Sequence, residues 1–197
     1  KITIDILNRI SYISNYKYKL RHTMKLKQII AATVSAALTG TVVIGSLTLP
    51  VIAAEQERLW SEQEANCLAL NIYYESRGSN LADKAGVADV VLNRKYDTRY
   101  PNTICEVVQQ GIKNADGSMK RNKCQFSWYC DGKSDNPQDQ DRWNEAQMIA
   151  SQLLEWGKYR GITEGATHYH ATYVSPRWAK DLQQVGRLGA HIFYRWD

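Results

Sequence analysis

The 197-residue sequence lacks several features that would point to other classes of protein. It has no internal repeat and no low-complexity tract, so we expect one folded domain rather than an array. It has no C-x2-C pair, which disfavours a cysteine-rich zinc site. The net charge of +5 comes from the first 54 residues, because residues 55–197 contain 18 basic and 19 acidic side chains. That part of the chain offers no electrostatic basis for binding nucleic acid.

Residues 24–54 have the pattern of an export signal. The segment starts at Met24, two lysines follow, and residues 29–49 form an apolar stretch that also contains Gly, Ser and Thr. Small residues allow cleavage after Ala53 or Ala54. A retained signal-anchor is the alternative, because about 20 apolar residues can span a bilayer. We expect this weakly hydrophobic segment to be cleaved, with only transient membrane contact.

The remaining chain divides on either side of that signal. We expect residues 1–23, which begin without Met, to be an upstream extension. Residues 55–197 then form one exported, monomeric domain in the periplasm, the cell envelope or the medium. An even number of cysteines in such a domain favours two disulfides over a zinc site. Three pairings are open among Cys67, Cys105, Cys124 and Cys130.

Capping signals predict three helices in the first half of the domain. Ser61 and Glu64 make a capping box, and Gly78 is the expected end of the helix that they begin. Asn80 caps a second helix, whose apolar residues line one face. A short third helix is predicted over residues 103–110.

The second half of the domain is predicted to contain a long loop, one helix and two strands. Residues 112–136 are rich in Gly, Asn, Asp, Lys and Ser, and predict a long loop pinned by cysteines, a kind of loop that is usually functional. Pro137 should open a helix that closes near Gly157. Alternating residues predict strands over 166–174 and 190–195, which can pair antiparallel. The fold class is therefore α+β, mainly helical, with a small antiparallel β element.

Glu75 is the carboxylate with the most informative position. At about 100° per residue, it shares the apolar face of the first helix with Leu68 and Ile72. Loss of water there raises the pKa of a carboxyl group toward the value that a general acid needs. The alternative is structural, with Glu75 paired to Arg77 or to a distant arginine.

Ordered blocks between residues 62 and 195 resemble the cell-wall hydrolase family that includes the spore cortex-lytic enzymes of the SleB type. The blocks are Asn71–Gly78, Val90–Arg94, Cys124–Trp128 with Cys130–Gly132, Gly165–Ala171 and Val174–Ala179. The resemblance implies a lysozyme-like, two-lobed domain over residues 55–197 that cleaves peptidoglycan glycan strands without a cofactor. It also implies that Glu75 is the catalytic acid.

The number of catalytic carboxylates separates two mechanisms. Ordinary glycosidases need a second acid. Asp131 is the best candidate and Asp89 a weaker one, although each is more simply explained as a turn-forming or ion-paired residue. A single carboxylate suits a lytic transglycosylase, in which Glu75 gives a proton at the MurNAc–GlcNAc bond and then takes one from the muramic acid C6 hydroxyl. We therefore favour transglycosylation, which leaves a 1,6-anhydro end, over hydrolysis.

The matched blocks also supply candidate substrate-binding residues. Hydrogen bonds to N-acetyl and hydroxyl groups are expected from polar side chains, and stacking on sugar rings from aromatic ones. The polar candidates are Gln125, Ser127, Tyr169 and His170, and the aromatic ones are Trp128, Tyr173 and Trp178. Core packing is the alternative for each aromatic residue.

Two other functions stay open at this point. His168 and His170 lie at i and i+2 of a strand and could bind zinc, as in an N-acetylmuramoyl-L-alanine amidase, but no third ligand is evident. A non-catalytic peptidoglycan-binding module is the other alternative, although a binder has no need of an acid on an apolar helix face. The sequence does not choose between cell-wall remodelling, spore germination and a phage endolysin.

Overall fold

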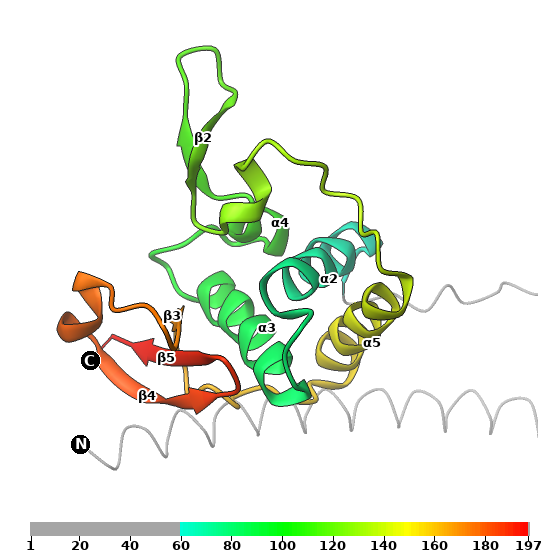
Figure 1. The fold of residues 1–197 in the computed structure, drawn as a ribbon. Helices are drawn as coiled ribbons and strands as arrows, with labels where there is room; N and C mark the ends of the chain where they lie inside the picture. The colour runs from blue at the N-terminus through cyan, green and yellow to red at the C-terminus, as the bar shows by residue number, and fades with distance from the viewer. Residues whose placement is uncertain (1–59, 197) are drawn as a thin grey trace, which may run out of the picture. The chain divides into compact units, whose positions relative to one another are not determined.

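The computed structural model describes residues 60–196, and the predicted signal segment and upstream extension lie outside them (Figure 1). The helices are α2 (Glu62–Ser76), α3 (Leu81–Tyr96), α4 (Ile104–Val108) and α5 (Gln140–Trp156), with short 3-10 helices η2 (Ser127–Cys130) and η3 (Arg177–Asp181). The strands are β1 (Gly111–Lys113), β2 (Met119–Cys124), β3 (His168–Ala171), β4 (Gln183–Leu188) and β5 (His191–Arg195). No helix within residues 60–196 has the length and apolar character that a membrane crossing requires.

The predicted capping box at the start of α2 is only half formed. The Ser61 side chain accepts a hydrogen bond from the backbone N–H of Glu64 at 3.1 Å, as predicted. The Glu64 carboxylate does not return to Ser61, since it accepts from the N–H of Ile104 at 2.6 Å and of Cys105 at 3.4 Å. Those N–H groups lie in the first turn of α4, where no intrahelical partner is available. Glu64 therefore ties the start of α4 to α2.

The other helix boundaries are partly as predicted. Asn80 and Thr103 cap α3 and α4, but α4 ends at Val108, and α2 ends at Ser76 before it reaches Gly78. Gly157 ends α5 in a left-handed conformation, with φ of 65°.

The prediction that Pro137 opens a helix was wrong, because α5 begins three residues later. Asp139 is the N-cap of α5, and its side chain accepts from the N–H of Arg142 at 3.1 Å. The N–H groups of Gln138 and Asp139 donate to the Tyr73 hydroxyl at 3.1 and 3.0 Å. These bonds hold the chain against α2 before the helix can start.

The prediction of a continuous loop over residues 112–136 was also wrong. The segment contains most of the antiparallel hairpin of β1 and β2, and then η2. Cys124–Cys130 joins β2 to η2, and Cys67–Cys105 joins α2 to α4. The expectation of two disulfides is confirmed, and the structure fixes the pairing that the sequence left open.

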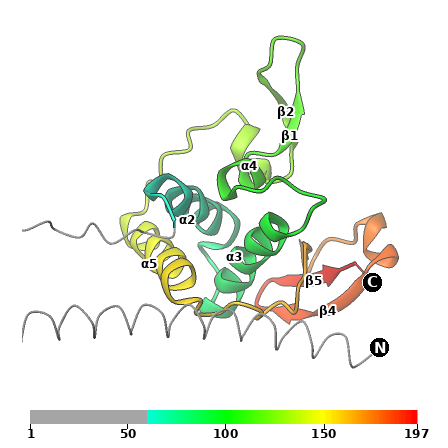
Figure 2. The same ribbon diagram turned by 180° about the vertical axis from the view of Figure 1, so that it is seen from behind.

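The C-terminal part forms a three-stranded sheet in the order β3–β5–β4. β3 and β5 pair antiparallel as predicted, with His168 opposite Tyr194 and Ala171 opposite His191. β4 was missed, because Gln183–Leu188 contains two glutamines, a glycine and an arginine among only two apolar residues. Figure 2 shows β4 and β5 beside α3, which separates the sheet from the other helices.

Two apolar clusters hold these layers together. In the main cluster α2 packs against α3, α4 and α5, and Leu68 and Ile72 are fully buried. The second cluster joins α3 to the sheet through Val90, Ala166 and Phe193. Gly86 permits this approach, because a Cβ there would lie 2.8 Å from the Phe193 ring. The predicted two-lobed, mainly helical α+β domain is confirmed.

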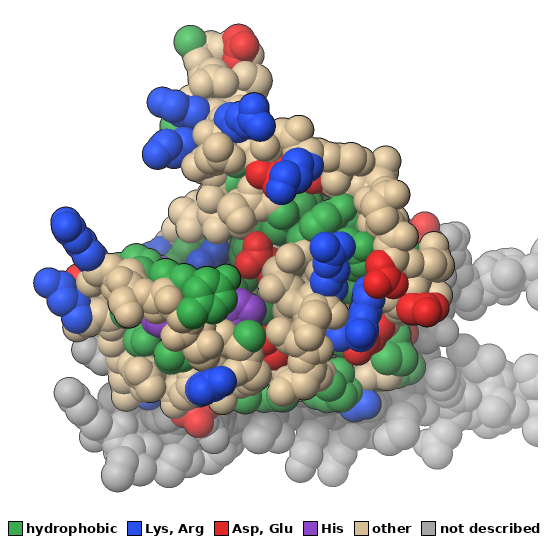
Figure 3. All heavy atoms as spheres, in the orientation of Figure 1, with side chains coloured by type: hydrophobic (Ala, Val, Ile, Leu, Met, Phe, Trp, Pro, Cys, Tyr) green, Lys and Arg blue, Asp and Glu red, His purple; other side chains and the backbone are tan. Residues whose placement is uncertain are grey.

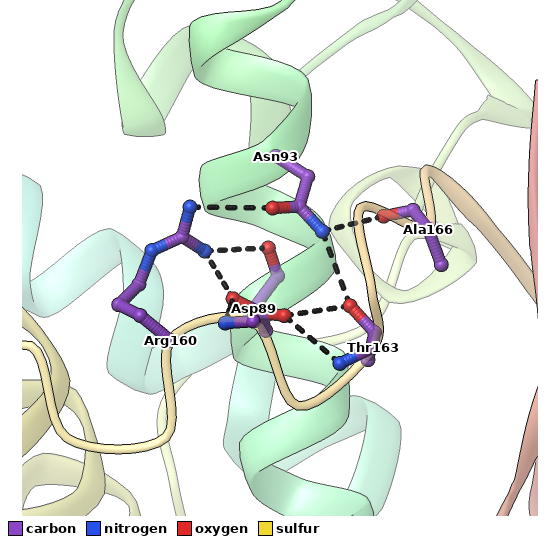
Figure 4. A network of polar contacts seen from close by, with 6 residues as sticks. Asp89, Asn93, Arg160, Thr163 and Ala166 are labelled. Carbon is purple, nitrogen blue, oxygen red and sulfur yellow. Dashed lines mark hydrogen bonds and ion pairs between the residues drawn. The ribbon is translucent and has the colours of Figure 1, made fainter. Parts of the chain in front are cut away.

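Asp89 fixes the loop that leads into β3 (Figure 4). Its buried carboxylate forms an ion pair with Arg160 and accepts from the N–H of Gly161 at 3.1 Å. It also accepts from the N–H of Thr163 at 3.1 Å and from the Thr163 hydroxyl at 2.6 Å. Asn93 adds a bond to the carbonyl of Ala166 at 2.8 Å. Asp89 is thus an ion-paired structural residue, the simpler of the two explanations given for it, rather than a second acid.

We expect Asp89→Asn to lower the free energy of unfolding by about 3 kcal/mol, because it leaves the half-buried Arg160 without its counter-ion. Urea unfolding measures the change. Asp131→Asn is the matched control, since Asp131 lies in a turn at the surface, and it should change stability by less than about 0.5 kcal/mol. Equal stability of the Asp89 variant and the parent protein would contradict this assignment.

Candidate functional site

Glu75 lies in the last turn of α2, on the predicted apolar face. The side chain is partly buried, and burial raises the pKa of its carboxyl group above the ordinary value. Three groups act in the opposite direction: a hydrogen bond from Tyr169 and the positive charges of His191 and Arg94. Because burial prevails, Glu75 holds its proton closer to neutral pH than an ordinary glutamate does.

Tyr169 brings the sheet to Glu75. It stands on β3, and its hydroxyl donates a hydrogen bond to Glu75 Oε2 at 3.0 Å. Burial and the neighbouring Glu75 charge raise the pKa of Tyr169 well above its usual value, so the phenol stays protonated and remains a donor. Its ring packs against His191 and Phe193, with centroids 5.0 and 5.6 Å apart.

Asp83 and His191 form a buried pair behind Tyr169. His191 Nδ1 lies 2.7 Å from Asp83 Oδ1, and Asp83 also accepts from the N–H of Ala190 at 3.1 Å. Burial tends to raise the pKa of Asp83, but hydrogen bonds from His191, Ser79 and Ala190 lower it overall. The ionised Asp83 therefore fixes the orientation of His191 against the Tyr169 ring.

Arg94 is a second fixed cation near Glu75. Its side chain is buried, Nε donates to the carbonyl of Thr167 at 2.7 Å, and its guanidinium lies 5.3 and 5.2 Å from the rings of Tyr100 and Phe126. Arg77, which the structural alternative offered as a partner of Glu75, donates instead to the Tyr73 hydroxyl at 3.2 Å. The positive charges that act on Glu75 thus come from α3 and β5 and not from the neighbouring turn.

The structure separates the candidates in the segment after β2. Trp128 is buried, donates to Asn71 Oδ1 at 3.1 Å and stacks on Tyr74 with ring centroids 4.8 Å apart. These contacts are those of a residue packed in the core, which was the alternative to sugar stacking for Trp128. Gln125 and Ser127 expose their side chains on either side of Phe126, in the loop that Cys124–Cys130 closes.

His170 and Trp178 lie together on the sheet face opposite Tyr169. His170 stacks on Tyr194 at 5.2 Å, and Trp178 packs edge-on against both rings. The ring nitrogens of His170 contact the Ala171 carbonyl at 2.9 Å and the Tyr194 hydroxyl at 3.0 Å. Tyr173 is 89% exposed and stands outside this cluster.

The zinc alternative fits this arrangement poorly. Both ring nitrogens of His170 are in contact with protein partners, and His168 Nδ1 lies 3.0 Å from the Thr167 hydroxyl. Within residues 60–196, no three His, Cys, Asp or Glu side chains are grouped so that they could hold a metal ion.

Asp131 is not placed as a partner of Glu75. Its carboxylate accepts from the N–H of Lys133 at 2.8 Å and lies 3.7 Å from Lys133 Nζ, as expected for a turn residue. In Figure 3 acidic, histidine and apolar side chains gather in a hollow on the face between the sheet and the helices.

Comparison with known families then identifies the chain. A family model described as Cell Wall Hydrolase matches residues 78–194. The chain belongs to this cell wall hydrolase family. The matched segment includes Asp83, Arg94, Tyr169 and His191 but begins three residues after Glu75.

Two solved structures are similar to the chain. The catalytic domain of the germination-specific lytic transglycosylase SleB from Bacillus anthracis aligns with a TM-score of 0.50 at 22% identity, over 69% of this chain and 97% of that one. The catalytic domain of the Bacillus cereus SleB protein aligns with a TM-score of 0.48 at 22% identity, over 69% and 92%. The likeness to the Bacillus anthracis domain shows the fold, which is lysozyme-like. The comparison with curated proteins gave no match.

Sequence reasoning proposed Glu75 as the acid and Tyr169 as a substrate-binding residue, but it assigned no role to Asp83, Arg94 or His191. Arg94 is the last residue of the block Val90–Arg94, and its place in a block that resembles the family was the one signal that could have identified it as a site residue. The pairing of Asp83 with His191 joins residues 108 positions apart, and no local pattern reveals it.

The raised pKa of Glu75 predicts how stability depends on pH. A raised pKa means that the folded state binds the proton more tightly, so stability falls as pH rises from the unfolded-state pKa through the folded-state pKa. Glu75→Gln removes this loss. The variant should therefore match the parent at about pH 3.5 and be more stable at about pH 8.

Thermal unfolding across this pH range tests the prediction. Glu155→Gln, an exposed change on α5, serves as the control and should show no such divergence. A Glu75→Gln variant that is less stable than the parent at about pH 8 would mean that the carboxylate is a net stabilising group.

Proposed function

We propose that this chain cleaves the glycosidic bond between MurNAc and GlcNAc in peptidoglycan, with Glu75 as the catalytic acid. Membership of the cell wall hydrolase family supports a peptidoglycan substrate. The observation that carries the choice of Glu75 is its raised pKa in a partly buried position, together with the hydrogen bond from Tyr169. A group of this kind can donate a proton near neutral pH.

The proposed reaction uses Glu75 twice. Protonated Glu75 gives its proton to the glycosidic oxygen while the bond from C1 of muramic acid to that oxygen breaks. The resulting carboxylate then takes the proton of the C6 hydroxyl as the C6 oxygen bonds to C1. The product is a 1,6-anhydro end, and Glu75 is protonated again. Tyr169 and Arg94 stabilise the carboxylate between the two steps.

The surroundings of Glu75 favour this single-carboxylate mechanism over hydrolysis. In a two-carboxylate glycosidase the second acid lies about 5 to 10 Å from the first, close enough to raise its pKa. Apart from burial, the groups that shift the pKa of Glu75 most are Tyr169, His191 and Arg94, none of which carries a carboxylate. Asp83 and Asp89 are committed to His191 and Arg160.

Substrate contacts are proposed from the side chains that remain accessible. Gln125 and Ser127 are exposed and polar, and can hydrogen-bond to N-acetyl and hydroxyl groups. Tyr173 and Trp178 offer aromatic surface for sugar rings. His170 would hold Trp178 in place, and Trp128 would support the helix that carries Glu75.

The cellular setting is proposed from the same observations. Two disulfides and a cell-wall substrate fit an exported, monomeric enzyme of the periplasm, cell envelope or medium. Cell-wall remodelling and host lysis by a phage endolysin both require this chemistry. No cofactor takes part in the proposed steps.

Glu75→Gln should lower the rate of peptidoglycan cleavage by about 10³-fold or more, because the amide can neither give nor take the proton. The variant should still bind purified sacculi. Asp131→Asn is the control and should retain most of the activity. Undiminished cleavage by Glu75→Gln would refute the proposed role of Glu75.

Mass spectrometry of the digest identifies the bond and the mechanism. Transglycosylation gives muramic ends that are one water lighter than hydrolysed ends. Products with ordinary reducing ends would indicate hydrolysis and a second acid. Free stem peptides, with activity lost in EDTA and restored by zinc, would indicate an amidase instead.

A further inference from the structure

The hairpin of β1 and β2 projects from the helices as a basic arm (Figures 1 and 2). Its basic side chains are all exposed, and they gather on the arm in Figure 3. They are Lys113, Lys120, Arg121 and Lys123. The hairpin is not part of the chemistry proposed for Glu75, so its charge requires another explanation.

The charge of the hairpin contrasts with that of the rest of the domain. Residues 111–124 contain four basic side chains and one acidic side chain, whereas the other described residues contain 13 basic and 15 acidic ones. The one acid, Asp116, accepts bonds from the Ser118 N–H at 2.9 Å and hydroxyl at 2.6 Å. No ion pair within residues 60–196 uses a basic side chain of the hairpin. Its positive charge is therefore available to a partner.

The base of the hairpin is held firmly against the segment proposed to bind substrate. Cys124–Cys130 joins β2 to η2, and the N–H of Gln125 donates to the Gln110 carbonyl at 2.8 Å. Arg121 Nε donates to the Asp131 carbonyl at 3.1 Å, and its guanidinium lies over Gly132, where a Cβ would be 3.2 Å away. A surface fixed in this way loses little conformational entropy on binding.

We propose that this hairpin is a docking surface for the carboxylates of peptidoglycan stem peptides. The inference rests on the proposed function, because the stem peptides hang from the muramic acid units whose bond Glu75 would cleave. Stem peptides repeat along the strand and carry free carboxylates, which complement exposed lysines in a region that contains few acids. Lysine ammonium groups act here as point charges and accept variable geometry. The hairpin would thus hold the strand beside Gln125 and Ser127 while Glu75 acts.

The test measures binding rather than cleavage. In the Glu75→Gln background, Lys113→Gln, Lys120→Gln and Lys123→Gln together should weaken binding to purified sacculi about tenfold at about 0.1 M salt. The difference should disappear near 1 M salt, where the screening length is about 3 Å. Arg121 is left in place because it bonds to the Asp131 carbonyl.

Two controls make the outcome specific. Arg142→Gln, Lys158→Gln and Arg187→Gln remove the same charge from exposed sites outside the hairpin, and should leave binding within about twofold of the parent. Sacculi whose carboxyl groups have been amidated should abolish the difference between the hairpin variant and its parent. Sacculi treated with hydrofluoric acid, which removes phosphodiester-linked polymers, should preserve it.

Three results would overturn the proposal: equal binding by the hairpin variant, an equal loss in the control variant, or a loss of the difference only after hydrofluoric acid treatment. The last would assign the hairpin to phosphodiester polymers. None of them bears on Glu75, whose role is decided by cleavage products, so the two proposals fail separately.

Discussion

The hydrogen bond from Tyr169 to Glu75 is the contact on which the arrangement of the candidate site depends. It joins β3 to the last turn of α2, two elements that lie 94 residues apart in sequence. α3 holds both elements in position, because it packs against α2 on one side and against Phe193 of the sheet on the other. Asp89 on α3 fixes the loop before β3, and Gly86 lets Phe193 of β5 lie close against α3. The fold thereby places one phenol against one carboxylate.

That contact is balanced against burial, and the balance suits a group that must give a proton and then take one back. Burial, acting alone, would favour the protonated acid. A hydrogen bond and nearby positive charges, acting without burial, would favour the carboxylate. At Glu75 both are present, with burial larger and with Tyr169, His191 and Arg94 opposing it. Both influences act on the same carboxyl group, and a group that is proposed to act as acid and then as base needs contacts that favour each of its two charge states.

Local signals predicted the local parts of this structure. Ser61 and Asn80 were predicted as caps because each bond lies within one turn of its helix. Glu75 was found because helix periodicity marks a carboxylate on an apolar face. The residues that position Glu75 and Tyr169 lie on distant elements, and no local sequence pattern indicates them. Asp83 contacts His191, and Arg94 contacts Thr167, only in the folded chain. β4 and the hairpin were missed for a related reason, since their polar sequences form strands through pairing with neighbours.

The number of hydrogen-bond donors separates Glu75 from the acids that serve the fold. Asp89 accepts from Arg160, two backbone N–H groups and the Thr163 hydroxyl. Asp83 accepts from His191 and a backbone N–H, and Glu64 accepts from two backbone N–H groups. In these three residues the carboxylate oxygens are occupied by donors from the protein. Glu75, in contrast, is partly buried and accepts from the Tyr169 hydroxyl at one of its oxygens. This difference in donors, rather than the presence of acids in the core, distinguishes the candidate catalytic residue from the structural ones.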